Sequence, residues 1–123
     1  MGKKLKGRWE DEPNKDDYAA AESFLTLIYD EQSSASFVKK LKKAEVLQFK
    51  AKDIFRASEL PLLGINNFHV KADQKRLVAG KKLSPLLLVR QTSGGKVIIA
   101  DGYHRLCAAY SLDEDASIPC KIV

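Results

Sequence analysis

The sequence predicts an α+β domain in which a small mixed β-sheet carries packed helices. Two kinds of apolar spacing support this prediction. Helical spacing recurs in four segments, and short alternating or continuous apolar runs, which are typical of strands, lie between and after them. The chain has 123 residues, of which 45% are hydrophobic, so one core can form without disulfides or a structural metal.

The first thirteen residues are expected to form a flexible arm, followed by a single domain over residues 14–123. The arm begins with basic residues at Lys3, Lys4, Lys6 and Arg8. A solvated tail is the favoured interpretation of this arm, and contact with nucleic acid is the alternative. Within the domain we expect a helical extension over residues 14–45 and a core over residues 46–123.

Two helices are predicted in the extension. Asn14 can cap the first, over residues 15–30, and a serine-rich break over residues 32–36 precedes a second over residues 37–44. The second helix carries four lysines, Lys39, Lys40, Lys42 and Lys43. A solvated helix face is favoured for them, and contact with a phosphate backbone is the alternative. The extension is expected to cover the sheet or to form a homodimer.

The core is predicted to alternate short strands and helices. Gly80 is a plausible C-cap for a basic helix, and Pro85 opens an apolar strand that pairs with the next strand as a hairpin. The expected order begins with a strand from residue 46 to about 52, a helical turn at 54–58 capped by Asp53, a loop at 60–68 and a helix at 70–79. Two strands follow at 86–89 and 97–100, joined by a turn at 92–95. The chain then continues as a helix at 102–112, an acidic loop at 113–115 and a strand at 118–123.

The junction between the strand at 97–100 and the following helix is the candidate functional site. Gly102 permits an unusual backbone angle, and the first amides of a helix attract anions. Arg105 offers a rigid fork of donors to a phosphate, with an ion pair to Asp101 or to the acidic loop as the alternative. His104 is assigned either to anion binding and proton transfer or to a structural role.

Asp101 and Cys107 each leave alternatives open. A helix cap is the favoured role for Asp101, and the alternatives are a ligand to a magnesium ion that accompanies a nucleotide, or a general base. Cys107 and Cys120 are expected to be buried apolar residues, although a reactive thiol at Cys107 is an alternative. The acidic loop at 113–115 is favoured as a solvated turn over a metal site.

The order of these elements, with Leu83-Ser84-Pro85 before a Leu-Leu-Leu-Val strand and Gly102-x-x-Arg105-x-x-Ala108 after the next strand, resembles the ParB/sulfiredoxin superfamily over residues 46–123. The resemblance implies a turn that binds nucleotide phosphates: CTP in ParB proteins, ATP in sulfiredoxins and ADP in a related free-serine kinase. It places four residues on that turn: Gly102, Tyr103, His104 and Arg105. Lys71, Lys75 and Arg76 are weaker candidates from the preceding helix.

One departure from the sulfiredoxin pattern limits the chemistry. Sulfiredoxins carry Gly-Cys-His-Arg at this turn with the cysteine as nucleophile, whereas this chain has Tyr103 there. Tyrosine cannot perform that thiol chemistry, so the chain is not expected to be a sulfiredoxin. ParB proteins usually carry Gly-Glu-Arg-Arg at this turn and continue into further domains. We expect no such further domains here, and so predict a stand-alone domain.

The leading functional hypothesis is therefore a nucleotide-binding domain for CTP, ATP or ADP, with magnesium as a possible companion of the nucleotide. Hydrolase or phosphotransferase activity is left open, with Asp101 and His104 as the catalytic candidates. The alternatives are a nucleic-acid-binding or nuclease-like module using the basic helices, and a non-enzymatic partner-binding protein. The net charge of +5 decides little, because acidic clusters interrupt the basic residues. We expect a cytoplasmic protein with no membrane partner, since no apolar run is long enough to span a bilayer.

Overall fold

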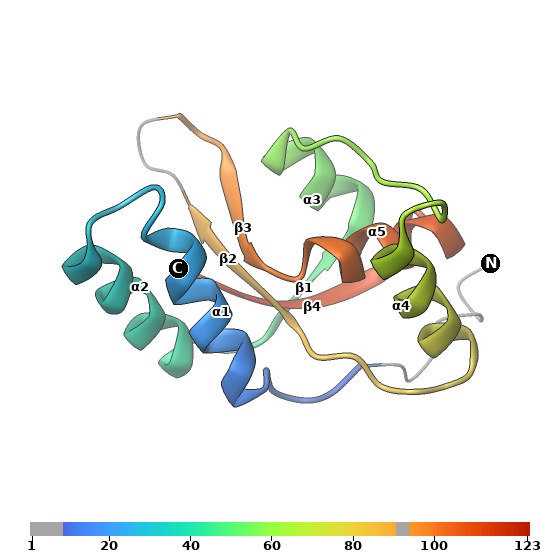
Figure 1. Ribbon diagram of the computed structural model, residues 1–123, viewed down its shortest axis with the longest axis horizontal. Helices are drawn as coiled ribbons and strands as arrows, with labels where there is room; N and C mark the ends of the chain where they lie inside the picture. Colours follow the sequence, from blue (N-terminus) through green and yellow to red (C-terminus); the bar gives the residue numbers. More distant parts are fainter. Residues whose placement is uncertain (1–8, 91–93) are drawn as a thin grey trace.

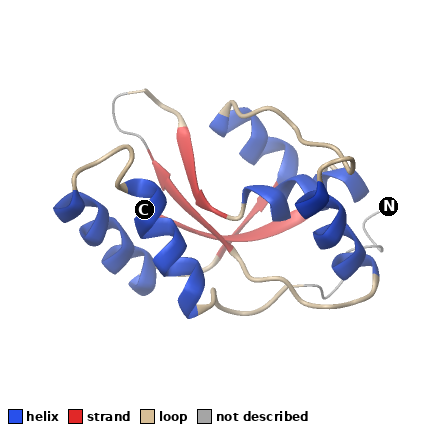
Figure 2. Cartoon of the chain, in the orientation of Figure 1, coloured by secondary structure: helices blue, strands red, loops and turns tan. Residues whose placement is uncertain are grey.

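The computed structural model describes residues 9–90 and 94–123 as a four-stranded sheet with helices on both faces (Figure 1, Figure 2). The helices are α1 (Lys15–Leu25), α2 (Glu31–Lys43), α3 (Ala51–Ser58), α4 (Phe68–Val78) and α5 (Tyr103–Leu112). The strands are β1 (Leu47–Lys50), β2 (Leu86–Arg90), β3 (Val97–Asp101) and β4 (Ser117–Ile122). The predicted small mixed sheet with packed helices is confirmed.

The strand order in the sheet is β1-β4-β2-β3. β4 pairs antiparallel with β1 and parallel with β2, with Leu86 opposite Cys120. β2 and β3 form the predicted antiparallel hairpin, with Val89 opposite Ile98. Of the turn predicted between them at 92–95, residues 92 and 93 lie outside the described residues.

Two apolar cores lie on opposite faces of the sheet, and β2 contributes to both. Leu86 and Leu88 belong to the core under α3, α4 and α5, whereas Leu87 and Val89 belong to the core under α1 and α2. This alternation follows from the period of two along a strand, and it explains why β2 is apolar at four successive positions. The helical extension therefore covers one face of the sheet, which is one of the two roles expected for it.

The boundary between α1 and α2 differs from the prediction. α1 ends at Leu25 rather than near residue 30, and α2 begins at Glu31 rather than at residue 37. The cap is Asp30, whose carboxylate accepts the N–H of Ser33 at 2.7 Å. The serine-rich run therefore lies within the first turns of α2, because a strong N-terminal cap outweighs the modest helix propensity of serine.

The boundaries of β1, α3 and α4 also differ from the prediction. β1 ends at Lys50, and the buried Ala51 begins α3, so Asp53 lies inside that helix and does not cap it. α4 begins two residues early because the Asn67 side chain accepts the N–H of His69 at 2.9 Å and that of Val70 at 3.2 Å. Gly80, with a φ of 84°, follows α4 as predicted.

The described end of the predicted arm, residues 9–12, contacts the core, while residues 1–8 lie outside the described residues. Trp9 pairs with Leu83 in a parallel bridge, and the N–H of Glu10 donates to the Leu83 carbonyl at 2.7 Å. Glu12 pairs with the Nζ of Lys121 at 2.9 Å, and the side chain of Lys121 is 2% exposed. The same Nζ donates to the carbonyl of Lys42 at 3.1 Å. These bonds join β4 to the end of α2 and to the segment before α1.

Among the described residues, no helix has the length and apolar character needed to cross a membrane.

Candidate functional site

A polar hollow of about 290 Å³ lies between α4 and the start of α5. All five residues of the predicted junction line it, so the structure brings the sequence-predicted site together: Asp101, Gly102, Tyr103, His104 and Arg105. The remaining lining residues come from α4: Phe68, His69, Ala72, Asp73 and Arg76. Of the three weaker candidates on α4, Arg76 lines the hollow and the exposed Lys71 and Lys75 do not.

The first turn of α5 presents backbone donors at this hollow. Its first intrahelical hydrogen bond runs from the N–H of Leu106 to the carbonyl of Gly102 at 3.0 Å. The N–H groups of Tyr103, His104 and Arg105 therefore have no acceptor within the described part of the chain, and no side chain caps the helix. Together with the helix dipole, three free donors favour an anion at this position.

The predicted cap role of Asp101 is wrong. Asp101 is the last residue of β3, the cap position is Gly102 with a φ of 111°, and Asp101 instead accepts the Nη2 of Arg105 at 3.1 Å. The carboxylate is drawn to the guanidinium one helical turn away because both side chains are largely buried, with 18% and 16% of their surface exposed. The ion pair to Asp101, the alternative expected for Arg105, is thus present.

Arg105 also binds the segment that leads into β2. Its Nε donates to the Ser84 carbonyl at 2.9 Å, and its Nη2 donates to the Pro85 carbonyl at 3.2 Å. These bonds hold the start of α5 against the strand beside β3. Nη1 makes no hydrogen bond with the residues that the structure describes, so this nitrogen is the part of the guanidinium that a ligand can use.

Burial raises the pKa of Asp101 from 3.8 to about 6, with Arg105 opposing the rise and the neighbouring Asp17 carboxylate adding to it. Asp17 lies in the first turn of α1, where it accepts the N–H of Asn14 at 2.9 Å. The helical extension thus places a second carboxylate, that of Asp17, next to Asp101. The sequence contains no local signal for this contact, because it arises from the packing of α1 on β3.

The stability of the fold is expected to fall as pH rises from about 4 to about 7, through this one carboxyl group. The folded state holds the Asp101 proton more tightly than the unfolded chain, so its favourable contribution is complete below pH 3.8 and is lost as pH passes about 6. At about 1.4 kcal/mol for each pH unit between the two pKa values, the loss is at most about 3 kcal/mol.

Asp101→Asn should therefore flatten the pH dependence of the free energy of unfolding. Asparagine keeps an acceptor for the Nη2 of Arg105 and has no proton to release. Urea denaturation of both proteins across this pH range measures the difference, since all other groups are common to the two. Parallel curves for wild type and variant would refute the raised pKa of Asp101.

A row of rings crosses the hollow. The His69 and His104 rings lie 5.0 Å apart between centroids, and Phe68 and Tyr103 extend the row at 5.6 Å and 5.7 Å. The side chain of Phe68 is 79% exposed. Burial, with nearby His69 and Arg105, lowers the pKa of His104 despite the opposing effect of Asp73. His104 is therefore neutral at pH 7 and able to accept a proton.

The sequence reading missed His69 and Asp73 in this hollow. Asp73 pairs with Arg76 at 2.8 Å, and its side chain is largely buried. Their positions did contain a signal, because residues 69, 73 and 76 are spaced by four and three and so share one face of α4. What the spacing cannot show is that this face of α4 lies against the start of α5.

Tyr103 and Cys107 also have structural roles near the start of α5. The Tyr103 hydroxyl donates to the Pro61 carbonyl and so joins α5 to the loop before α4. Cys107 is fully buried in the core, where burial raises the pKa of its thiol. A thiol that resists ionisation is a poor nucleophile, which favours the expected role as a buried apolar residue.

A scan against protein-family models, a search of curated proteins and a search of solved structures each found no match to this chain. Resemblance to the ParB/sulfiredoxin superfamily stays a prediction. The function must therefore be argued from the site itself.

The other charged features lie away from the hollow. The four lysines of the second predicted helix, Lys39, Lys40, Lys42 and Lys43, are exposed on α2, which covers the opposite face of the sheet. In the acidic loop at 113–115, Asp115 pairs with Lys52 at 2.7 Å. Among the described residues, no group of three His, Cys, Asp or Glu side chains is placed to hold a metal ion.

Proposed function

We propose that the polar hollow binds a nucleotide, with its phosphates at the first turn of α5. The observation that carries this proposal is a set of three backbone N–H groups, at residues 103–105, that have no acceptor among the described residues. All three residues line the polar hollow, where an anion could accept hydrogen bonds from these groups. A phosphate has enough acceptor oxygens to bind several such donors together. The ParB/sulfiredoxin resemblance is a separate reason to test CTP, ATP and ADP first.

The charges around the hollow are compatible with an anion. Two carboxylates, Asp73 and Asp101, line it, but each is paired with an arginine, at 2.8 Å and 3.1 Å respectively. Their formal charges therefore cancel, and the start of α5 supplies the remaining positive potential. Within the described residues Arg76 bonds to Asp73 through Nη1 alone, so its remaining donors can bind a phosphate while the pair stays intact.

The ring row favours a nucleotide over inorganic phosphate. Phe68 is the first residue of α4, is 79% exposed and contacts His69, which itself contacts His104. A large exposed aromatic ring beside an anion site provides a face on which a nucleobase can stack. We therefore assign the base to Phe68 and the phosphates to the α5 turn.

Phe68→Ala should weaken nucleotide binding by about tenfold, because stacking of one base contributes about 1–3 kcal/mol. Calorimetric titration with ATP, CTP and ADP measures the change. Inorganic pyrophosphate is the control ligand, and its affinity should be the same for both proteins. Val78→Ala is the matched control substitution, since Val78 is 59% exposed on α4 and does not line the hollow. Equal nucleotide affinity in wild type and Phe68→Ala would refute the stacking assignment.

Magnesium would enter this site bound to the nucleotide and contact a single carboxylate. Nucleotide-bound magnesium needs only one or two protein carboxylates besides the phosphates and water. Asp101, next to the α5 turn, is the residue that would hold it, and because its Oδ2 is paired with the Nη2 of Arg105 at 3.1 Å, the ion would share this carboxylate with the guanidinium. The assignment of proton transfer to Asp101 and His104 stays a prediction.

A further inference from the structure

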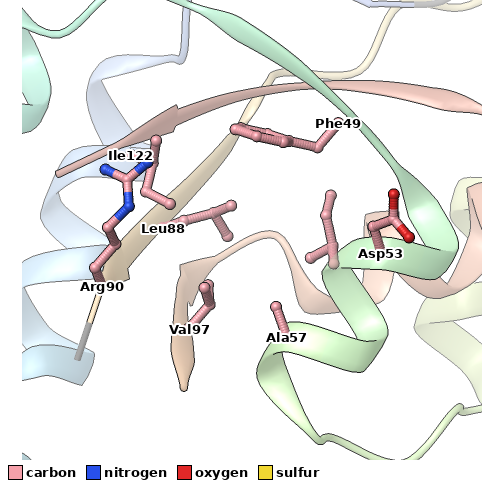
Figure 3. Close-up of a pocket in the computed structure, with 8 residues that line it drawn as sticks. Phe49, Asp53, Ala57, Leu88, Arg90, Val97 and Ile122 are labelled. Carbon is pink, nitrogen blue, oxygen red and sulfur yellow. The ribbon is translucent and has the colours of Figure 1, made fainter. Parts of the chain in front are cut away.

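A second hollow, of about 240 Å³, lies between α3 and the sheet (Figure 3). It is at the other end of β3 from the nucleotide site, because Val97 begins the strand and Asp101 ends it. All four strands contribute a lining residue, and α3 closes one side. The two hollows share no residue, so the second is a separate site.

The walls of this second hollow are apolar. Leu88, 2% exposed, points into it from β2, and Phe49 from β1 lies across from Ala57 on α3 (Figure 3). The remaining apolar lining residues are Ile54, Val97 and Ile122. Ala57 is the smallest side chain on the wall, and its size leaves the space open. Such walls favour an apolar ligand body, because its burial removes apolar surface from water.

The charges of this hollow stand on opposite sides, with Arg90 at the end of β2 and Asp53 on α3 (Figure 3). Asp53 is paired with Arg56 at 3.7 Å. Arg90 is exposed and has no ion pair or side-chain hydrogen bond with the residues that the structure describes. The available charge is therefore a guanidinium, which binds carboxylates through two parallel donors.

We propose that this hollow binds a small monocarboxylate with a compact apolar body, such as one aromatic ring or a branched chain. The carboxylate pairs with Arg90, and the apolar body lies between Leu88, Phe49 and Ala57. The volume is below the range of about 300–1,000 Å³ that accommodates drug-sized ligands, which limits the body to about one ring. A phosphorylated ligand is disfavoured, because the walls offer its further oxygens no donors.

The test uses phenylacetate as the probe and its neutral amide, phenylacetamide, as the comparison. Two-dimensional proton–nitrogen spectra of the full chain are expected to show saturable shifts around residues 53–57, 88–90 and 97 with millimolar phenylacetate. Binding of phenylacetamide should be about threefold to fivefold weaker, which is the upper part of the range for an exposed ion pair. Arg90→Gln should weaken phenylacetate binding by the same factor.

A substitution that fills the second hollow tests whether the ligand binds there. Ala57→Leu should abolish the shifts while leaving the melting temperature unchanged or higher, and Ala35→Leu, on the exposed side of α2, is the matched control that should bind as wild type. If Ala57→Leu fails to fold, Arg90→Gln and phenylacetamide still decide the outcome. The proposal is overturned by an absence of shifts at these residues, by equal binding of acid and amide, or by shifts at residues 103–105 instead.

Discussion

Gly102→Ala is expected to lower the free energy of unfolding by about 2–5 kcal/mol, which is the sum of backbone strain and overpacking. Gly102 has a φ of 111°, and a Cβ at this position would lie 2.6 Å from the Cγ of Leu86 and 3.0 Å from the Nη2 of Arg105. Leu86 is fully buried, so it has no room to withdraw. Urea denaturation followed by circular dichroism measures the loss.

Gly95→Ala is the matched control for this substitution. Gly95 also has a positive φ, of 67°, but a Cβ there would have no atom of the described residues within 4 Å. It should therefore lose only the strain contribution, about 1–2 kcal/mol. If the two variants are equally stable, the close contact of Gly102 with Leu86 does not constrain the start of α5 as we describe.

Arg105→Ala is expected to lower the free energy of unfolding by about 3–5 kcal/mol, as for other broken buried ion pairs. The substitution leaves the Asp101 carboxylate without its partner and removes the donors to the carbonyls of Ser84 and Pro85. Arg105→Lys should recover only part of the loss, because an ammonium cannot reproduce the guanidinium fork. Thermal and urea unfolding measure both variants.

Arg76→Ala is the control for Arg105, since it also removes an arginine that lines the hollow. Arg76 makes a single side-chain bond, to Asp73, whose own side chain is 12% exposed, whereas Arg105 makes three bonds, so the loss of stability should be smaller than for Arg105→Ala, about 1–2 kcal/mol. Equal losses for the two arginines would contradict the structural role of Arg105. Because Arg105→Ala is expected to unfold in part, its nucleotide affinity must be measured on the folded fraction. Phe68→Ala, whose side chain is exposed, tests the same site in a protein of unchanged stability.

The predictable part of the site is the part encoded locally. An apolar strand, a glycine turn and a helix-like run follow each other directly in the sequence, so the junction at 101–105 was predicted and the structure brings its residues into one hollow. Whether Asp101 caps the helix or pairs with Arg105 depends on the burial of the two side chains. Burial makes an unpaired carboxylate costly and so favours an arginine partner, and it has no sequence signal. The prediction of a cap was therefore wrong.

The unpredicted part depends on packing between distant segments. His69 and Asp73 join the site because α4 lies against α5, and Asp17 approaches Asp101 because α1 packs on β3. The start of α2 was a different kind of error, since Asp30, a favoured N-cap residue followed directly by the acidic Glu31, is a readable cap signal that the serine-rich run obscured. The packing of α4 on α5 and of α1 on β3 is determined by the two apolar cores, and no single segment of the sequence specifies those cores.

The most direct test of the nucleotide site is a titration of the isotope-labelled chain with ATP, CTP and ADP, with and without magnesium, followed by two-dimensional proton–nitrogen spectra. We predict saturable shifts of the backbone amides of Tyr103, His104 and Arg105 with at least one nucleotide, because these are the donors at the start of α5. Unchanged resonances for all three amides at millimolar concentrations of every nucleotide would contradict the proposed function.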